Sequence, residues 1–80
     1  MDIKVIGTGC PDCSRLYENT RRAVERLGLD ASVEKVEDLM DIVRLGVMSA
    51  PSLMVDGKLV LSGRVAGVDQ IAALLSAARN

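Results

Sequence analysis

The sequence contains no tryptophan, no phenylalanine and no histidine, and its only aromatic residue is Tyr17. Without large rings, the core has to be built from close-packed Val, Leu, Ile, Ala and Met side chains. Without histidine, the two cysteines of the chain cannot complete a closed zinc site, which takes a tetrahedral set of Cys and His ligands. The sequence therefore excludes a structural zinc site of that kind made by this chain alone.

Long apolar runs and an excess of charge are also missing. No segment approaches the ~18–20 consecutive apolar residues that a membrane span needs. The opening residues MDIKVIG lack a basic region followed by an apolar run. The net charge is −1, and basic residues are interleaved with acidic ones. We therefore expect no nucleic-acid partner, no membrane partner and a cytoplasmic location.

The length of 80 residues leaves room for one small domain, residues 1–80. A chain of this size buries only about 60–65% of the surface that its unfolded form exposes, so we expect modest stability. So small a surface gives no strong reason for a dimer, and we expect a monomer.

The first half of the chain has the pattern strand, helix, strand, helix. Residues 2–6 alternate as a short strand, and residues 30–36 do so as a strand near a sheet edge. Between them a helix starts at Pro11 and ends at the Gly28 cap. A second helix is expected over 38–45. The inner positions of the two helices are Cys13, Leu16, Tyr17, Thr20, Val24 and Leu27, and then Leu39, Ile42 and Val43.

The second half predicts a hairpin and a final helix. Two apolar runs flank Asp56-Gly57, a dipeptide that suits a type I′ turn. The last helix starts near Gly67 with Val68, Ile71, Ala72, Leu75 and Ala78 as its inner face. The order β-α-β-α-β-β-α predicts an α/β fold: a four-stranded mixed sheet with the first and third helices on one face and the second on the other.

The two cysteines lie where the first strand passes into the first helix. Cys10 is expected at the N-cap, and Pro11 takes the first helical position, where a missing N–H does no harm. The accessible sulfur of Cys10 then faces the unpaired N–H groups and the positive end of the helix dipole, which stabilise a thiolate. Cys13 points inward and is close enough to attack a mixed disulfide at Cys10. This asymmetry is what thiol–disulfide exchange requires, with the disulfide itself in place of a separate cofactor.

Pro11 and Asp12 are the candidates for local tuning of this pair. The carboxylate of Asp12 disfavours a nearby thiolate and so opposes the helix dipole. The alternative role of Asp12 is purely structural, because an acid in the first helical turn stabilises the helix.

Two other interpretations of the cysteines stay open. A soft ion such as Cu(I) accepts two sulfur ligands, and a strand–CxxC–helix opening also occurs in copper chaperones. Those domains finish on a strand, whereas this chain is expected to finish on a helix. The third interpretation is a docking module that has kept the fold and lost turnover. Apart from the Cu(I) alternative, we predict no metal ligands.

A second motif is Ala50-Pro51, directly before the first strand of the hairpin. A residue without an N–H is awkward at the start of a central strand. A cis bond there would turn the chain at the sheet edge and expose the backbone groups of Ala50, whereas an ordinary trans proline is the alternative.

Together, the segments GCPDC, SAP and VDGKLVLSG and the element order resemble the thioredoxin fold over essentially the whole chain. The chain looks most similar to the small glutaredoxin-like or thioredoxin-like redox-active disulfide proteins of archaea and bacteria. The resemblance implies a thiol–disulfide oxidoreductase with Cys10 as nucleophile, Cys13 as resolving thiol and Pro51 as a cis-proline beside them. It implies that the backbone of Ala50 pairs with an extended substrate.

The partners implied are proteins that contain disulfides and an upstream reductase. Lys4, six residues before Cys10, stands near the place of the buried acid that assists the resolving cysteine of thioredoxins. A lysine does not take over the proton-relay role of that acid.

Overall fold

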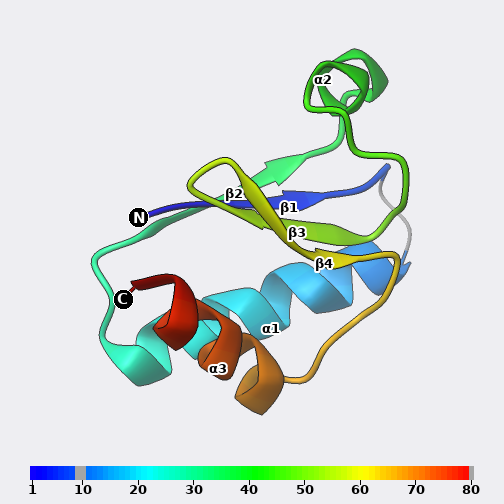
Figure 1. Cartoon of the computed structure of the whole chain (residues 1–80). Helices are drawn as coiled ribbons and strands as arrows, with labels where there is room; N and C mark the ends of the chain where they lie inside the picture. Colours follow the sequence, from blue (N-terminus) through cyan, green and yellow to red (C-terminus); the bar gives the residue numbers. More distant parts are fainter. Residues whose placement is uncertain (9–10, 80) are drawn as a thin grey trace.

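The computed structural model describes residues 1–8 and 11–79. Seven elements follow one another along the chain (Figure 1): β1 (Asp2–Ile6), α1 (Pro11–Leu27), β2 (Ser32–Val36), α2 (Leu39–Arg44), β3 (Ser52–Val55), β4 (Lys58–Ser62) and α3 (Val68–Arg79). This order confirms the predicted β-α-β-α-β-β-α arrangement.

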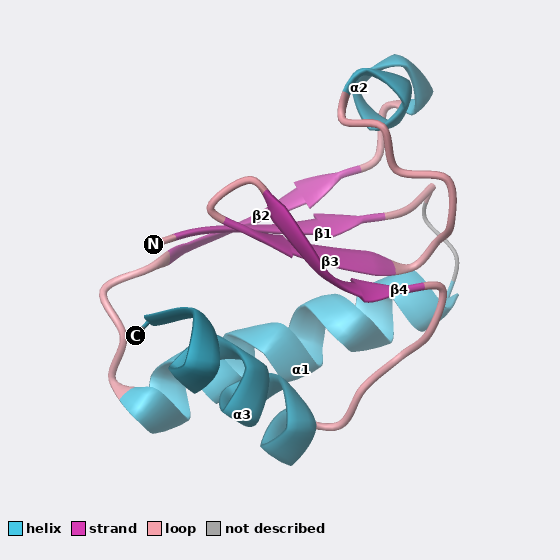
Figure 2. Ribbon diagram, in the orientation of Figure 1, coloured by secondary structure: helices cyan, strands magenta, loops and turns pink. Residues whose placement is uncertain are grey.

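The strands form one mixed sheet in the order β2-β1-β3-β4. β1 pairs parallel with β2 and antiparallel with β3, and β3 pairs antiparallel with β4. α1 and α3 lie side by side on one face, and α2 stands on the other (Figure 2). The predicted four-stranded sheet, the edge position of β2 and the assignment of helices to faces are therefore confirmed.

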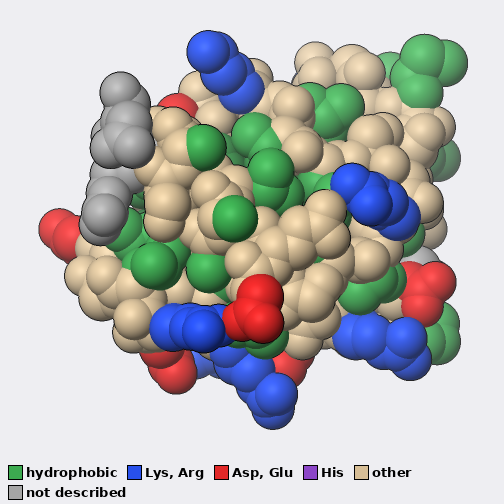
Figure 3. Space-filling view, turned by 60° about the horizontal axis from the view of Figure 1, so that its bottom comes forward, with side chains coloured by type: hydrophobic (Ala, Val, Ile, Leu, Met, Phe, Trp, Pro, Cys, Tyr) green, Lys and Arg blue, Asp and Glu red, His purple; other side chains and the backbone are tan. Residues whose placement is uncertain are grey.

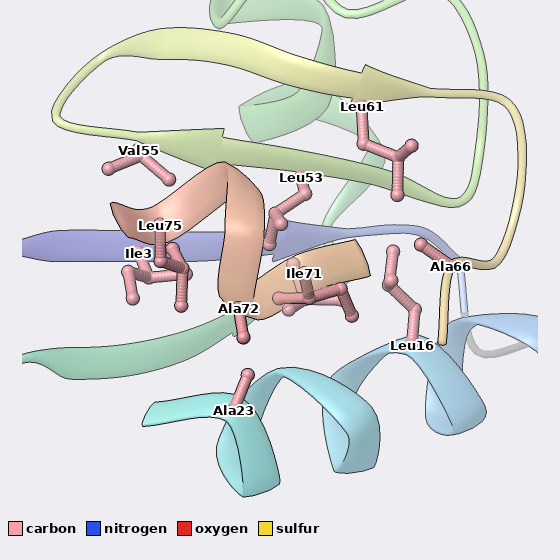
Figure 4. Close-up of a cluster of buried hydrophobic side chains, with 11 residues drawn as sticks. Ile3, Leu16, Ala23, Leu53, Val55, Leu61, Ala66, Ile71, Ala72 and Leu75 are labelled. Carbon is pink, nitrogen blue, oxygen red and sulfur yellow. The ribbon is translucent and has the colours of Figure 1, made fainter. Parts of the chain in front are cut away.

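The sheet separates two hydrophobic clusters because alternate side chains of a strand point to opposite faces. Within β1, Ile3 and Val5 face α1 and α3, whereas Ile6 faces α2. The larger cluster (Figure 4) consists of Ile3, Val5, Leu16, Ala23, Leu53, Val55, Leu61, Ala66, Ile71, Ala72 and Leu75. The smaller consists of Ile6, Val36, Ile42, Val47 and Met54. The buried members of both clusters are aliphatic side chains and methionine, and the half-buried Tyr17 packs against the larger cluster.

The contact between α1 and α3 depends on small side chains. Figure 4 shows Ala23 of α1 and Ala72 of α3 pointing toward each other, and both are buried. Sequence periodicity found Ala72 but not Ala23, because an alanine adds little to a hydrophobic stripe. Ala78 was wrongly assigned to the inner face; it is exposed near the end of the helix.

The predicted inner stripe of α2 is largely wrong. Ile42 is buried, but Leu39 and Val43 are 65% and 63% exposed. The helix has only six residues, so it turns less than twice and presents one large side chain to the sheet. The other apolar side chains of α2 therefore face solvent.

The predicted turns are confirmed by the backbone angles. Gly28 and Gly46 end the first two helices with φ of 63° and 74°. Asp56 and Gly57 both have positive φ, 50° and 82°, as a type I′ turn requires. Two hydrogen bonds of 2.8 Å tie Asp56 to Asp2: each backbone N–H donates to an oxygen of the other residue.

Opposite charges are interspersed on the side of the molecule where α1 and α3 lie (Figure 3). Arg26 of α1 pairs with Asp69 of α3, and Arg22 pairs with Glu18 within α1 at 3.5 Å. Such exposed pairs contribute little stability. Among the helices of the described residues, none is both long and apolar enough to cross a membrane.

Candidate functional site

Cys13 lies in the first turn of α1 and is 5% exposed. The helix begins at Pro11, as predicted, and Pro11 and Asp12 are exposed on the same turn. Cys10, the predicted nucleophile, lies outside the described residues together with Gly9 and Asn80. The inward position predicted for Cys13 is confirmed.

The sulfur of Cys13 packs against Gly7, the buried residue that follows β1. A Cβ atom at Gly7 would fall well inside contact distance of Cys13 Sγ, 3.0 Å from Cys13 Cβ and 3.9 Å from Ala50 Cβ. The missing side chain of Gly7 therefore lets the first turn of α1 approach the sheet and brings Cys13 close to Ala50. In the sequence, Gly7 directly follows the residues 2–6 that predict a strand, and a glycine at a strand end can signal a close backbone approach.

The Ala50–Pro51 peptide bond is cis, as one of the two sequence alternatives predicted. Pro51 is buried, and its carbonyl accepts a 2.9 Å hydrogen bond from the N–H of Gly63. The hydroxyl of the buried Ser52 donates to the carbonyl of Ser49 at 2.5 Å, which closes the turn around Ala50. Ala50 itself is exposed, and no hydrogen bond within residues 1–8 and 11–79 engages its backbone N–H or C=O. The structure thus brings Ala50 near Cys13, and the buried Pro51 follows it in the chain.

An apolar groove opens beside Ala50. Its volume is about 200 Å³. Met48 and Val43 contribute exposed apolar surface to it, 97% and 63% exposed. The residues that line it are Thr8, Leu39, Ile42, Val43, Val47, Met48, Ser49 and Ala50. The sequence did not predict this groove, because the spacing of Leu39 and Val43 indicates core positions. In the structure, these two side chains of α2 line the groove instead.

Cys13 also borders a small, partly open space of about 10 Å³, lined by Val5, Gly7, Cys13, Ser14, Lys35 and Glu37. The Nζ of Lys35 lies 3.9 Å from Glu37 Oε1 and 5.0 Å from the centre of the Tyr17 ring. A lysine–carboxylate pair therefore lines the same small space as Cys13.

Lys4 does not contribute to this site. It lies on the face of β1 that carries Ile6, opposite to Val5, and its Nζ donates a 2.9 Å hydrogen bond to Asp2. That hydrogen bond raises the pKa of Lys4; the negative charges of Asp2 and Glu34 act in the same direction, while partial burial opposes them. Lys4 therefore lies on the face of the sheet away from α1 and Cys13.

Asp12 is exposed and lies 4.0 Å from Arg15 in the next turn. Its charge is therefore largely screened by solvent and by a counter-ion. Within the part of the chain that the structure describes, no group of three or more His, Cys, Asp or Glu side chains is arranged to hold a metal ion.

Known proteins resemble the chain over most of its length. A sequence model of the thioredoxin domain matches residues 1–76. A protein named thioredoxin from Methanothermobacter thermautotrophicus is 43% identical over 76 residues, which are 95% of this chain and 99% of that protein. A second protein named thioredoxin, from Methanocaldococcus jannaschii, is 41% identical over 69 residues, 86% of this chain and 79% of the relative.

Proposed function

We propose that this chain, which belongs to the thioredoxin-domain family and is a thiol–disulfide oxidoreductase, reduces disulfide bonds in other proteins with a Cys10/Cys13 dithiol. The observation that carries the proposal is the placement of Cys13: a buried thiol in the first turn of α1, next to Gly7 and Ala50. A resolving thiol needs this sheltered position near an exposed nucleophile.

In the proposed reaction, the Cys10 thiolate attacks one sulfur of a substrate disulfide. A Cys10–substrate disulfide forms, and the other substrate sulfur leaves as a thiolate. Cys13 then attacks Cys10, which releases the second substrate thiolate and leaves a Cys10–Cys13 disulfide. An upstream reductase returns the pair to the dithiol. The N-terminus of α1 favours the Cys10 thiolate, and Pro11 and Asp12 adjust its environment.

The substrate is proposed to bind as an extended peptide segment across Ala50. Its backbone would pair with the exposed N–H and C=O of Ala50, while an apolar side chain enters the groove lined by Val43 and Met48. Backbone pairing gives affinity without sequence preference, and the groove adds a preference for apolar side chains. We place this activity in the cytoplasm, where reducing conditions make a cycling pair more useful than a structural disulfide.

Equilibration with graded thiol–disulfide buffers tests whether the pair cycles. We expect the protein to pass between dithiol and disulfide in one two-electron transition, which thiol alkylation and mass spectrometry measure. Cys10→Ser and Cys13→Ser should abolish the transition. Cysteines that stay reduced at every buffer ratio contradict the proposal. In that case retention of Cu(I) by the reduced protein would favour the soft-metal carrier.

Substitutions in the groove test its role in substrate binding. Met48→Asp removes an apolar side chain that we expect to pack on the substrate. Burying such a side chain is worth about 1.5–3 kcal/mol, so KM for a protein disulfide should rise roughly tenfold or more. The rate with a small disulfide that does not reach the groove should not change. Steady-state kinetics with the two substrates measures the difference.

Leu59→Asp is the matched control. Leu59 is 47% exposed on β4 and does not line the groove, so this variant should retain the parental KM for both substrates. If Met48→Asp impaired the reduction of the protein disulfide and of the small disulfide equally, the groove would not be a substrate-binding site.

A further inference from the structure

The segment that follows β4 packs against the turn that carries Ala50. The N–H of Gly63 donates to the carbonyl of Pro51 at 2.9 Å. A Cβ atom at Gly63 would lie 3.4 Å from the Cβ of Ser49, and the φ of Gly63 is 73°, so a glycine suits this close approach on both counts. Residues 63–67 therefore begin directly beside the turn across which the substrate is proposed to bind.

Both ends of this segment are held by contacts with the rest of the fold. Ala66 is 2% exposed, and its carbonyl accepts a 3.0 Å hydrogen bond from Nδ2 of Asn19 on α1. Gly63 is held at the other end by its hydrogen bond to Pro51. Arg64 directly follows Gly63, and its side chain is exposed. The backbone of Arg64 is thus fixed next to the turn, while its side chain is in contact with solvent.

Arg64 is a cation without an ionic partner in the described structure. The other charged side chains on the elements around the site are paired: Asp12 with Arg15, Lys35 with Glu37, and Arg44 with Asp41. Arg64 forms no ion pair within residues 1–8 and 11–79. The net charge of the chain is −1, so the molecule as a whole does not attract acidic partners. A preference for negative charge at this turn therefore has to come from Arg64 itself.

The apolar groove and Arg64 lie on opposite sides of the proposed substrate path. The groove is lined by side chains of α2, which stands on one face of the sheet, whereas residues 63–67 run from β4 toward α3 on the other face (Figure 1). Successive side chains of an extended peptide point in opposite directions. When one side chain of the substrate enters the groove, the next one along the chain therefore points toward Arg64.

We propose that Arg64 is a specificity-determining residue, which selects substrate segments with an acidic side chain directly beside the apolar side chain that enters the groove. This inference rests on the proposed function and names the class of substrate: protein segments that combine an apolar and an adjacent acidic residue near the reactive cysteine. The guanidinium donates to the substrate carboxylate, an acceptor that matches its planar donor geometry. The steps at sulfur are unchanged, because Arg64 acts on binding alone.

Peptides with a single cysteine test the proposal. The cysteine is activated as a mixed disulfide with an uncharged chromogenic thiol, and the peptide carries one leucine with glutamate, glutamine or lysine directly beside it. The release of the chromophore measures the second-order rate constant. At low salt we expect the glutamate peptide to react about three- to fivefold faster than the glutamine peptide and the lysine peptide to react most slowly, as for an exposed ion pair. At about 1 M salt the difference should disappear.

Substitution of Arg64 should change this preference alone. Arg64→Gln should make the glutamate and glutamine peptides react equally, and Arg64→Glu should favour the lysine peptide. Both variants should react at the parental rate with a small uncharged chromogenic disulfide, which does not extend to residue 64. With glutamate two residues from the leucine, even the parent should show no preference for glutamate, because these two side chains point to the same side.

Lys58→Gln is the matched control. Lys58 is an exposed cation at the far end of β4, opposite Val55, and it forms no ion pair in the described part of the chain. Its replacement removes the same charge and should keep the parental preference.

Several results would overturn the role of Arg64. They are a parent that reacts equally with all three peptides, an unchanged preference in Arg64→Gln, the same loss in Lys58→Gln, and an equal loss with the uncharged disulfide. An equal preference at both spacings from the leucine would overturn the assignment of Arg64 to the adjacent side chain. A parent that releases the chromophore from none of the peptides would overturn the proposed function, and this inference with it.

Discussion

Replacing Cys13 with serine should leave the protein covalently bound to its substrate. Cys10 can still attack a disulfide, but the mixed disulfide has no internal thiol to resolve it. An external thiol then has to do so, and a well-placed internal group is equivalent to an external concentration of roughly 10⁵ M or more. We expect turnover to fall by roughly a thousandfold or more and the mixed disulfide to accumulate. Non-reducing electrophoresis and intact mass measure it.

Cys10→Ser is the control for this trap. Cys13 is buried at 5% exposure, so it should not attack an external disulfide, and no adduct should form. Equal trapping by both variants, or by neither, would contradict the assignment of nucleophile and resolving thiol. Alkylation under native conditions should also differ: the thiol of Cys10 in Cys13→Ser should react readily, and that of Cys13 in Cys10→Ser should react slowly.

Gly7→Ala should destabilise the protein, because the added methyl group meets the resolving thiol. The new Cβ would overlap Cys13 Sγ and come within 3.0 Å of Cys13 Cβ. Rotation of the sulfur relieves only the first contact, so β1 or the first turn of α1 also has to move. We expect a loss of about 2 kcal/mol in the free energy of unfolding and a Tm lower by roughly 10 °C. Circular dichroism of the reduced protein measures it.

The displaced Cys13 should also resolve the mixed disulfide more slowly. With one equivalent of a chromogenic aromatic disulfide, release of the second coloured thiolate would report this step. Gly67→Ala is the matched control. No atom lies within 4 Å of a Cβ placed there, so Gly67→Ala should lower the free energy of unfolding by no more than about 1 kcal/mol. The Gly7→Ala protein could instead be as stable as the parent and resolve the mixed disulfide at the parental rate. That result would show that the contact between Gly7 and Cys13 is not tight in solution.

Much of the fold could be predicted because local signals agree with one another. β1 was expected over residues 2–6 and is found at Asp2–Ile6. The turn at Asp56-Gly57 and the helix stops at Gly28 and Gly46 were read from residues that tolerate positive φ, and all four have it. Such features depend on a few neighbouring residues, so they can be seen without knowing the rest of the chain.

The apolar face of α2 shows where this reasoning fails. Leu39 and Val43 have the spacing of a core stripe, yet both are mostly exposed. Periodicity tells which residues share a face, but only the packed structure tells whether another element covers that face. Here the helix is short and contacts the sheet through Ile42, so its remaining apolar surface lines a groove.

In the candidate site, too, some features follow from the local sequence and others from the packing of distant segments. The sequence by itself determined that Cys13 turns inward from the start of a helix, because the strand, the glycine break and the proline at the first helical position lie within a dozen residues. Only the tertiary structure decided that Gly7, Ala50 and Glu37 surround it. These three come from segments far apart in the chain, and their meeting depends on the register of β1 with its neighbours and on one missing side chain. Contacts of that kind are set by packing between elements, and no local pattern of residues encodes them.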